Sequence, residues 1–365
     1  MTHDQLAIIW FVLIAVLWCG YFVLEGFDFG VGILLPFIGK NEAERRTIVS
    51  TLGPVWDGNE VWLLTAGGAT FAAFSLWYAT LFSGFYLALL LILVALIVRG
   101  VAFEFRSKRG TTAAPNWRRN WDWAIVFGSF LPALLWGVAF ANIVAGVPLE
   151  LQNGNSEFTG NLFTLLNPYA LLGGLVTLGL FTTHGAIFLA LKTEGDIRTR
   201  ANKLAGQIGL VTAVLAVAFG LWTQLAHSNN TVASVVVLVL VVLAWVGALA
   251  ANRLGREGWA FIASAATMVF VVAFLFVCLP ERDAELHERG RDAHGPERGE
   301  LAVHPHDHDL GRGDPDAGRA GLPVVDLLGV PQAALPQPDP APGGGVARPA
   351  ARGVGVTAGT THHVT

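Results

Sequence analysis

The stretch Leu6-Ala-Ile-Ile-Trp-Phe-Val-Leu-Ile-Ala-Val-Leu-Trp-Cys-Gly-Tyr-Phe-Val-Leu24 decides the fold class of this chain. It carries no charged residue, and as a helix it is long enough to cross a bilayer, which takes ~20 apolar residues. No basic cluster precedes it, and it is longer than the apolar run of a cleavable secretion signal. We therefore expect the first segment to stay in the protein as a transmembrane helix.

The rest of the chain repeats this character. Of 365 residues, 53% are hydrophobic and 14% are charged, which is too apolar for an ordinary soluble domain. The sequence predicts an all-α polytopic membrane protein and favours neither nucleic-acid binding nor soluble-type catalysis, because it contains no phosphate-binding loop, dinucleotide fingerprint or nucleophile elbow. About eight stretches have the length and apolarity of a span, near residues 6–35, 51–73, 77–99, 121–146, 164–191, 204–226, 231–252 and 258–279.

The basic residues predict the orientation of these spans. Fifteen Lys and Arg lie between residues 1 and 279, all in or beside four alternate connections, and the intervening connections contain none. Loops rich in Lys and Arg stay in the cytoplasm. We therefore expect a multi-pass protein of a bacterial inner membrane with its N-terminus outside.

Composition divides the chain into two parts. A weak repeat, Phe22-Val-Leu-Glu-Gly26 against Phe181-Thr-Thr-His-Gly185, predicts two four-helix bundles at about 1–146 and 164–279. From residue 280 to 365 the chain contains no Phe, Trp, Tyr, Ile, Met, Lys, Asn or Ser, so this tail has too little apolar area to fold alone. The tail is either naturally disordered or translated out of frame from a GC-rich gene, and the residue set favours the second reading.

Four carboxyl groups are the candidate functional residues. Glu25 and Asp28 lie three apart in the first span, and Asp57 and Glu60 lie three apart in the second, so each pair shares a helix face. An acid inside a span is costly and marks a functional site by default. Four at similar depth favour a proton relay over a structural role in capping or in bonding backbone near glycines.

Cations and cofactor ligands are scarce in the spans. No Lys or Arg falls within the interior of a predicted span, and Arg99, at the end of the third, is the nearest cation. Some of the carboxyl groups must then be protonated, hydrated or paired with another subunit. The spans contain one His and one Met, His184 and Met268, so we expect this chain to ligate no haem and no metal on its own. His184 is predicted to be a buried, hydrogen-bonded residue.

Four segments form a distinctive set of motifs: Glu25-Gly-Phe-Asp-Phe-Gly-Val-Gly32, Gly53-Pro-Val-Trp-Asp-Gly-Asn-Glu-Val-Trp62, Thr65-Ala-Gly-Gly-Ala69 and Trp117-Arg-Arg-Asn-Trp-Asp-Trp123. With further matches in order along residues 1 to 279, they resemble subunit II of the cytochrome bd-type terminal quinol oxidases.

The resemblance implies a heterodimer and a role in respiration. In that family subunit I holds haems b and d and the quinol site, the complex reduces dioxygen to water, and small accessory subunits can attach. A cytoplasmic proton path there runs through the second span of subunit II, and Asp57 stands at the matching position. Trp56, Asn59 and Trp62 belong to the same motif and are expected to support it, as are Arg99 and His184.

The chain departs from the family at two places. The family has a ninth span where this chain has the tail that begins at Pro280, and it often has Gln at the position of His184. Two other interpretations therefore stay open: a transporter acting alone, with the acids as an ion site, or a defective, frameshifted subunit. A haem spectrum of the purified complex separates the first of these from an oxidase subunit.

Overall fold

The computed structural model describes residues 3–108, 115–152, 155–228 and 231–279, so the predicted tail lies outside the described residues. Within these ranges the chain is helical apart from one hairpin, which confirms the all-α class. The elements are α1 (His3–Ile38), α2 (Glu42–Leu52), α3 (Trp56–Ala73), α4 (Ser75–Gly84), α5 (Tyr86–Phe105), α6 (Pro115–Ala145), β1 (Leu149–Gln152), β2 (Asn155–Phe158), α7 (Leu162–Leu165), α8 (Pro168–Lys192), α9 (Gly195–Ala226), α10 (Thr231–Arg253) and α11 (Glu257–Val277).

Seven of the described helices are long and apolar enough to cross a membrane. The expected span at 51–73 corresponds to α3, which is not among the seven and carries Asp57, Asn59 and Glu60 in its first turns. The expected span at 77–99 is divided between α4 and α5, which meet at Phe85. The segment after the first span forms a separate helix, α2, whose Asn41 side chain accepts a hydrogen bond from the Glu44 backbone N–H.

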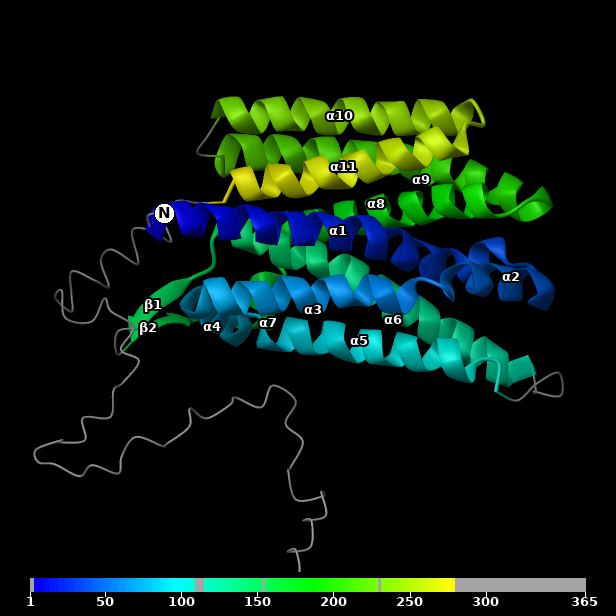
Figure 1. The fold of residues 1–365 in the computed structure, drawn as a ribbon, viewed down its shortest axis with the longest axis horizontal. Coiled ribbons are helices and arrows are strands. Elements are labelled where there is room, and N and C mark those ends of the chain that lie inside the picture. Colours follow the sequence, from blue (N-terminus) through cyan, green and yellow to red (C-terminus); the bar gives the residue numbers. More distant parts are fainter. Residues whose placement is uncertain (1–2, 109–114, 153–154, 229–230, 280–365) are drawn as a thin grey trace, which may run out of the picture. The chain divides into compact units, whose positions relative to one another are not determined.

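Helix α1 lies at the centre of the packing. It contacts α3, α6, α8 and α11, and Figure 1 shows it between α3 and α11. Two glycines allow α1 and α8 to touch through their backbones: a Cβ on Gly30 would lie 2.0 Å from the Phe181 carbonyl oxygen, and one on Gly185 would lie 2.5 Å from the Gly30 carbonyl carbon. Small residues commonly permit such close contact between membrane helices.

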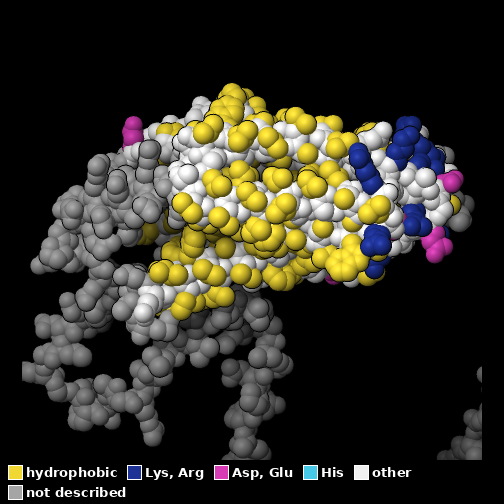
Figure 2. Space-filling model, turned by 90° about the horizontal axis from the view of Figure 1, so that it is seen from above, with side chains coloured by type: hydrophobic (Ala, Val, Ile, Leu, Met, Phe, Trp, Pro, Cys, Tyr) yellow, Lys and Arg dark blue, Asp and Glu magenta, His cyan; other side chains and the backbone are white. Residues whose placement is uncertain are grey.

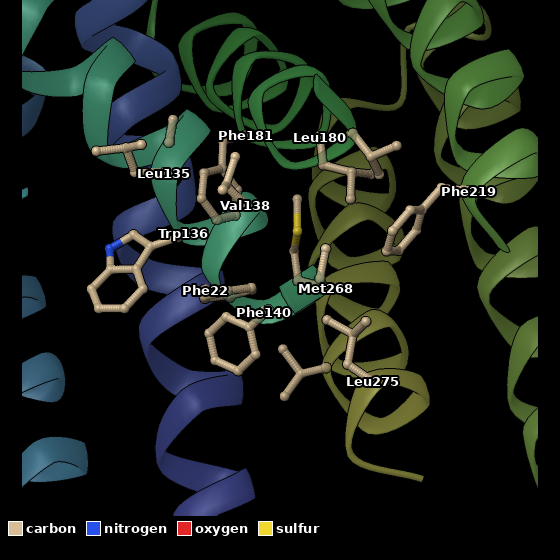
Figure 3. Packing of buried hydrophobic residues seen from close by; sticks show 14 of the residues in the cluster. Phe22, Leu135, Trp136, Val138, Phe140, Leu180, Phe181, Phe219, Met268 and Leu275 are labelled. Carbon is tan, nitrogen blue, oxygen red and sulfur yellow. The ribbon is translucent and has the colours of Figure 1, made fainter. Parts of the chain in front are cut away.

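Aromatic and aliphatic side chains from both halves of the sequence fill the core. Phe22 packs edge-on against Phe140 and Phe181, with both ring centroids 5.3 Å away, and Met268 of α11 is fully buried in the same cluster (Figure 3). The Trp136 indole N–H donates to the Tyr21 hydroxyl at 3.0 Å, so the polar edges of these rings are satisfied inside the core.

The outer surface has the two zones expected of a membrane protein. Figure 2 shows hydrophobic side chains along most of one face and Lys and Arg gathered at one end. This basic end contains α2, and the β1–β2 hairpin lies at the other end, where α1 begins (Figure 1). At the basic end Asp122 accepts from Arg106 at 2.6 Å and from Arg45 at 3.1 Å, so ion pairs join α2, α5 and α6.

Candidate functional site

Three of the four predicted carboxyl groups meet at one arginine. Arg99 Nη1 donates to Glu25 Oε1 and, at 3.1 Å, to Glu60 Oε1, while its Nη2 lies 3.1 Å from Asp28 Oδ1. Glu25 and Asp28 come from α1, Glu60 from α3 and Arg99 from α5. The ion pairs therefore join three helices inside the protein.

The expectation that these acids lack a cation inside the protein was wrong. Arg99 lies well inside α5, and its side chain has 0% exposure. Its place inside the helix was not predicted because the expected span ended at residue 99, whereas α5 continues to Phe105. The side-chain exposures of Glu25 and Asp28 are 1% and 0%, whereas that of Glu60 is 25%. Two acids are thus sealed within the protein and the third is partly accessible.

The surroundings of Arg99 are apolar and close-packed. The guanidinium carbon lies 4.9 Å from the ring centre of Phe29 and 5.2 Å from that of Phe103, within the range of cation–π attraction. Gly128 of α6 allows this arrangement, because a Cβ there would lie 2.5 Å from Arg99 Cβ and 2.6 Å from the Ala95 carbonyl oxygen. Because the Arg99 side chain has 0% exposure, the attraction between its guanidinium and the carboxyl groups is stronger than it would be in solvent.

Asn59 joins the second helix to the first. Its Nδ2 donates to Asp28 Oδ2 at 2.9 Å and to the Leu24 carbonyl at 3.3 Å. Because Asn59 is buried, these bonds fix the position of Asp28 relative to α3. Asn59 is therefore in direct contact with one of the candidate acids.

The two tryptophans of the motif pack helices together. The Trp62 ring lies against Gly20 of α1, where a Cβ would come within 2.2 Å of a ring carbon. The Trp56 ring lies against α5, with its centroid 5.4 Å from that of Phe103 and its edge close to Gly100. Both rings hold α3 beside its neighbours, and neither hydrogen-bonds to the carboxyl groups in the described structure.

Asp57 lies apart from the ion-paired cluster. Its side chain is exposed and accepts only from the Gly58 backbone N–H, at 2.8 Å, among the contacts of the described residues. Added Cβ atoms at Gly58, Gly67 and Gly68 would meet nothing within 4 Å. These glycines lie at different sides of α3, and no other described residue covers them, while Asp57 lies in the first turn of the helix.

The charges of the cluster do not balance when all its groups are ionised. Three carboxylates then face one guanidinium, which leaves two negative charges in a site that is mostly out of water. Burial of unpaired charge is costly, and such groups take up protons instead. Four buried atoms in the cluster also lack a hydrogen bond within the described residues: Glu25 Oε2, Asp28 Oδ1, Arg99 Nε and Arg99 Nη2.

His184 is buried and hydrogen-bonded on both ring nitrogens. Nε2 lies 3.2 Å from the Val23 carbonyl and Nδ1 lies 2.7 Å from Ser264 Oγ. A carbonyl only accepts, so Nε2 carries the proton in the bond to Val23. Ser264 Oγ, the partner of Nδ1, also donates to the Phe261 carbonyl at 3.0 Å. The His184 ring stacks on Phe261 at 4.7 Å. Within the residues that the structure describes, no group of three or more His, Cys, Asp or Glu is arranged to hold a metal ion.

The sequence matches a known protein family over most of its length. A family model described as cytochrome bd terminal oxidase subunit II matches residues 6–281. The chain belongs to this family. The buried acids and their arginine are accordingly a feature of a bd-oxidase subunit II chain.

Two relatives and one solved structure agree with the membership. This subunit II chain is 44% identical over 235 residues to cytochrome bd-I ubiquinol oxidase subunit 2 of Escherichia coli K12, covering 64% of this chain and 61% of that one. It is 40% identical over 280 residues to cytochrome bd ubiquinol oxidase subunit 2 of Bacillus subtilis, covering 76% and 80%. The chain thus spans about three-fifths of the E. coli relative.

The fold is also similar to the structure of bd oxidase from Geobacillus thermodenitrificans. The TM-score is 0.61 at 20% sequence identity, covering 74% of this chain and 83% of that one. At this identity the likeness concerns the fold, and it matches the all-helical membrane architecture described above.

Proposed function

We propose that this chain is the accessory subunit of a cytochrome bd-type quinol:oxygen oxidoreductase and supplies its cytoplasmic proton path. The observation that carries the proposal is the pairing of one buried arginine with three carboxyl groups from two neighbouring helices. Because three carboxyl groups share one guanidinium, at least one of them can bind and release a proton while the guanidinium stays charged. A carboxyl group with this environment in a membrane protein suits a proton relay.

The order of the path follows the exposure of its acids. Asp57 is exposed, the Glu60 side chain is 25% exposed, and Glu25 and Asp28 are sealed. Asp57 and Glu60 lie three apart on α3 and share a face, and Glu60 and Glu25 share Arg99. A proton would therefore pass from Asp57 to Glu60 and then to Glu25.

The uncovered glycines of α3 support a membrane partner. Another protein could cover the exposed Asp57 and pack closely on Gly67 and Gly68, because small residues permit close contact between helices. The proposed partner is the haem-bearing subunit I, which would contribute haems b and d and bind the quinol. Small accessory subunits and membrane lipid are further proposed contacts.

The proposed location is the bacterial inner membrane, with the N-terminus outside. The basic residues support it, because they gather at the end of the protein that contains α2, away from the start of α1 (Figures 1 and 2). A reporter fused before α1 would be accessible from outside the cell in this orientation and protected in the opposite one.

Purification of the full chain from bacterial membranes tests the assignment. We expect a haem-bearing membrane protein to co-purify and to give haem bands in a reduced-minus-oxidised spectrum. No haem in any partner would favour a transporter acting alone. In the same complex Asp57→Asn is expected to slow quinol oxidation with haem content retained, and unchanged turnover would remove Asp57 from the path.

A further inference from the structure

One nitrogen of Arg99 holds a sealed acid and an accessible acid together. Nη1 donates to Glu25 Oε1 and to Glu60 Oε1, and a guanidinium Nη carries two N–H groups. Both of its protons are therefore used, one on each acid. The Glu60 side chain retains 25% exposure, whereas that of Glu25 retains 1%.

The remaining groups of the cluster are arranged differently. Asp28 is held by Asn59 at 2.9 Å and by its ion pair with Arg99 Nη2 at 3.1 Å, so it has two fixed neighbours from other helices. Glu25 Oε2 is buried and has no hydrogen bond within the described residues. The sealed glutamate thus has a free oxygen beside the nitrogen that also binds Glu60.

Protonation of Glu60 would change this sharing. A neutral carboxyl group attracts a guanidinium much less than a carboxylate does, so whichever of the two acids holds the proton, the other binds Nη1 more strongly, and one proton can be exchanged between them. Removal of the proton reverses the change. The helices do not have to move, because the competition takes place at one nitrogen of one side chain.

We infer that Arg99 is a positioning residue that holds Glu60 and Glu25 on one guanidinium nitrogen, so that a proton taken up by Glu60 is delivered to Glu25. In this step the O–H bond of Glu60 breaks and an O–H bond forms on Glu25, no electron is transferred, and the guanidinium stays charged. The inference rests on the proposed function, since it describes how the path crosses from α3 to α1.

A simpler role for Arg99 is neutralisation of buried charge. The two roles differ in what a lysine would do at this position. Lysine supplies the charge as a single point, whereas arginine offers a rigid fork of N–H groups. A neutralising role is rescued by Arg99→Lys, but the positioning role is not.

The test measures kcat and the quinol KM of the purified complex for Arg99→Lys and Glu60→Asp. Glu60→Asp keeps the charge and shortens the side chain by one methylene, and a misplacement of ~1 Å can reduce a rate by about a hundredfold. We expect kcat per haem to fall by at least about tenfold in both variants, with KM unchanged because the quinol site is in the partner. Arg46→Lys, on the exposed side of α2, is the matched control with unchanged kcat.

The outcomes separate this inference from the proposed function. Normal kcat for Arg99→Lys and Glu60→Asp, with slow turnover for Glu25→Gln, would overturn the positioning role and leave the path standing. Normal turnover for Glu25→Gln and Glu60→Gln would overturn the path itself. If Arg99→Lys fails to assemble, Glu60→Asp decides alone, since its partly exposed site tolerates the shorter acid.

Discussion

Removal of the buried cation gives the most demanding prediction of the structure. In Arg99→Gln, the carboxyl groups of Glu25 and Asp28, which are at most 1% exposed, lose their cation in a dry environment. Breaking a buried ion pair by removal of one partner costs about 3–5 kcal/mol. We expect the free energy of unfolding of the detergent-purified protein to fall by about this amount, as measured by thermal or denaturant unfolding.

A matched variant separates the lost charge from the lost side-chain volume. Arg99→Gln combined with Glu25→Gln and Asp28→Asn removes the uncompensated acids and should recover most of the stability. Lower pH should also reduce the loss for Arg99→Gln, because protons then replace the cation. An unfolding midpoint equal to wild type for Arg99→Gln at neutral pH would refute the reasoning.

Three further predictions concern packing and charge elsewhere in the protein. Gly185→Val should destabilise the α1–α8 contact by about 3 kcal/mol, whereas Gly247→Val, at an open position, should change the unfolding midpoint little; equal effects would contradict the backbone contact. The backbone N–H of Lys40 and the Arg200 guanidinium hold the pKa of Glu44 below its usual range. The difference in unfolding free energy between wild type and Glu44→Gln should therefore be present at neutral pH and vanish as pH falls through that lowered pKa. A difference that grows in acid would contradict this prediction. His184→Ala should cost about 2–4 kcal/mol in unfolding and leave the haem content of the complex unchanged; loss of haem would show that His184 does more than pack.

The long apolar stretches were predictable because the bilayer sets a length that any spanning helix must reach. The run from Leu6 to Leu24 gave α1, and the alternation of basic connections agrees with the gathering of Lys and Arg at one end. Breaks within an apolar stretch were harder to predict. The division between α4 and α5 at Phe85 falls inside a sequence that is apolar throughout, so composition contains no signal for it.

The candidate site was predicted in part. Helix periodicity placed Glu25 beside Asp28, and the structure brings Glu60 to the same place. Asp57, three residues before Glu60, lies outside the cluster because α3 turns that side chain to the exposed side of the helix. The burial of Arg99 could not be predicted from the sequence, because a basic residue near the end of a span usually lies at the membrane interface. The packing of α5 against Gly128 and α1 shows that the Arg99 side chain is buried.

The central claim is that the sealed acid of α1 transfers protons for oxygen reduction. Its most direct test is the turnover of the purified complex carrying Glu25→Gln, which keeps the shape of the side chain and removes its ability to carry a proton. We expect an intact haem spectrum and a kcat lower by about a hundredfold, the usual contribution of a positioned proton-transfer group. An intact complex with wild-type kcat would contradict the account.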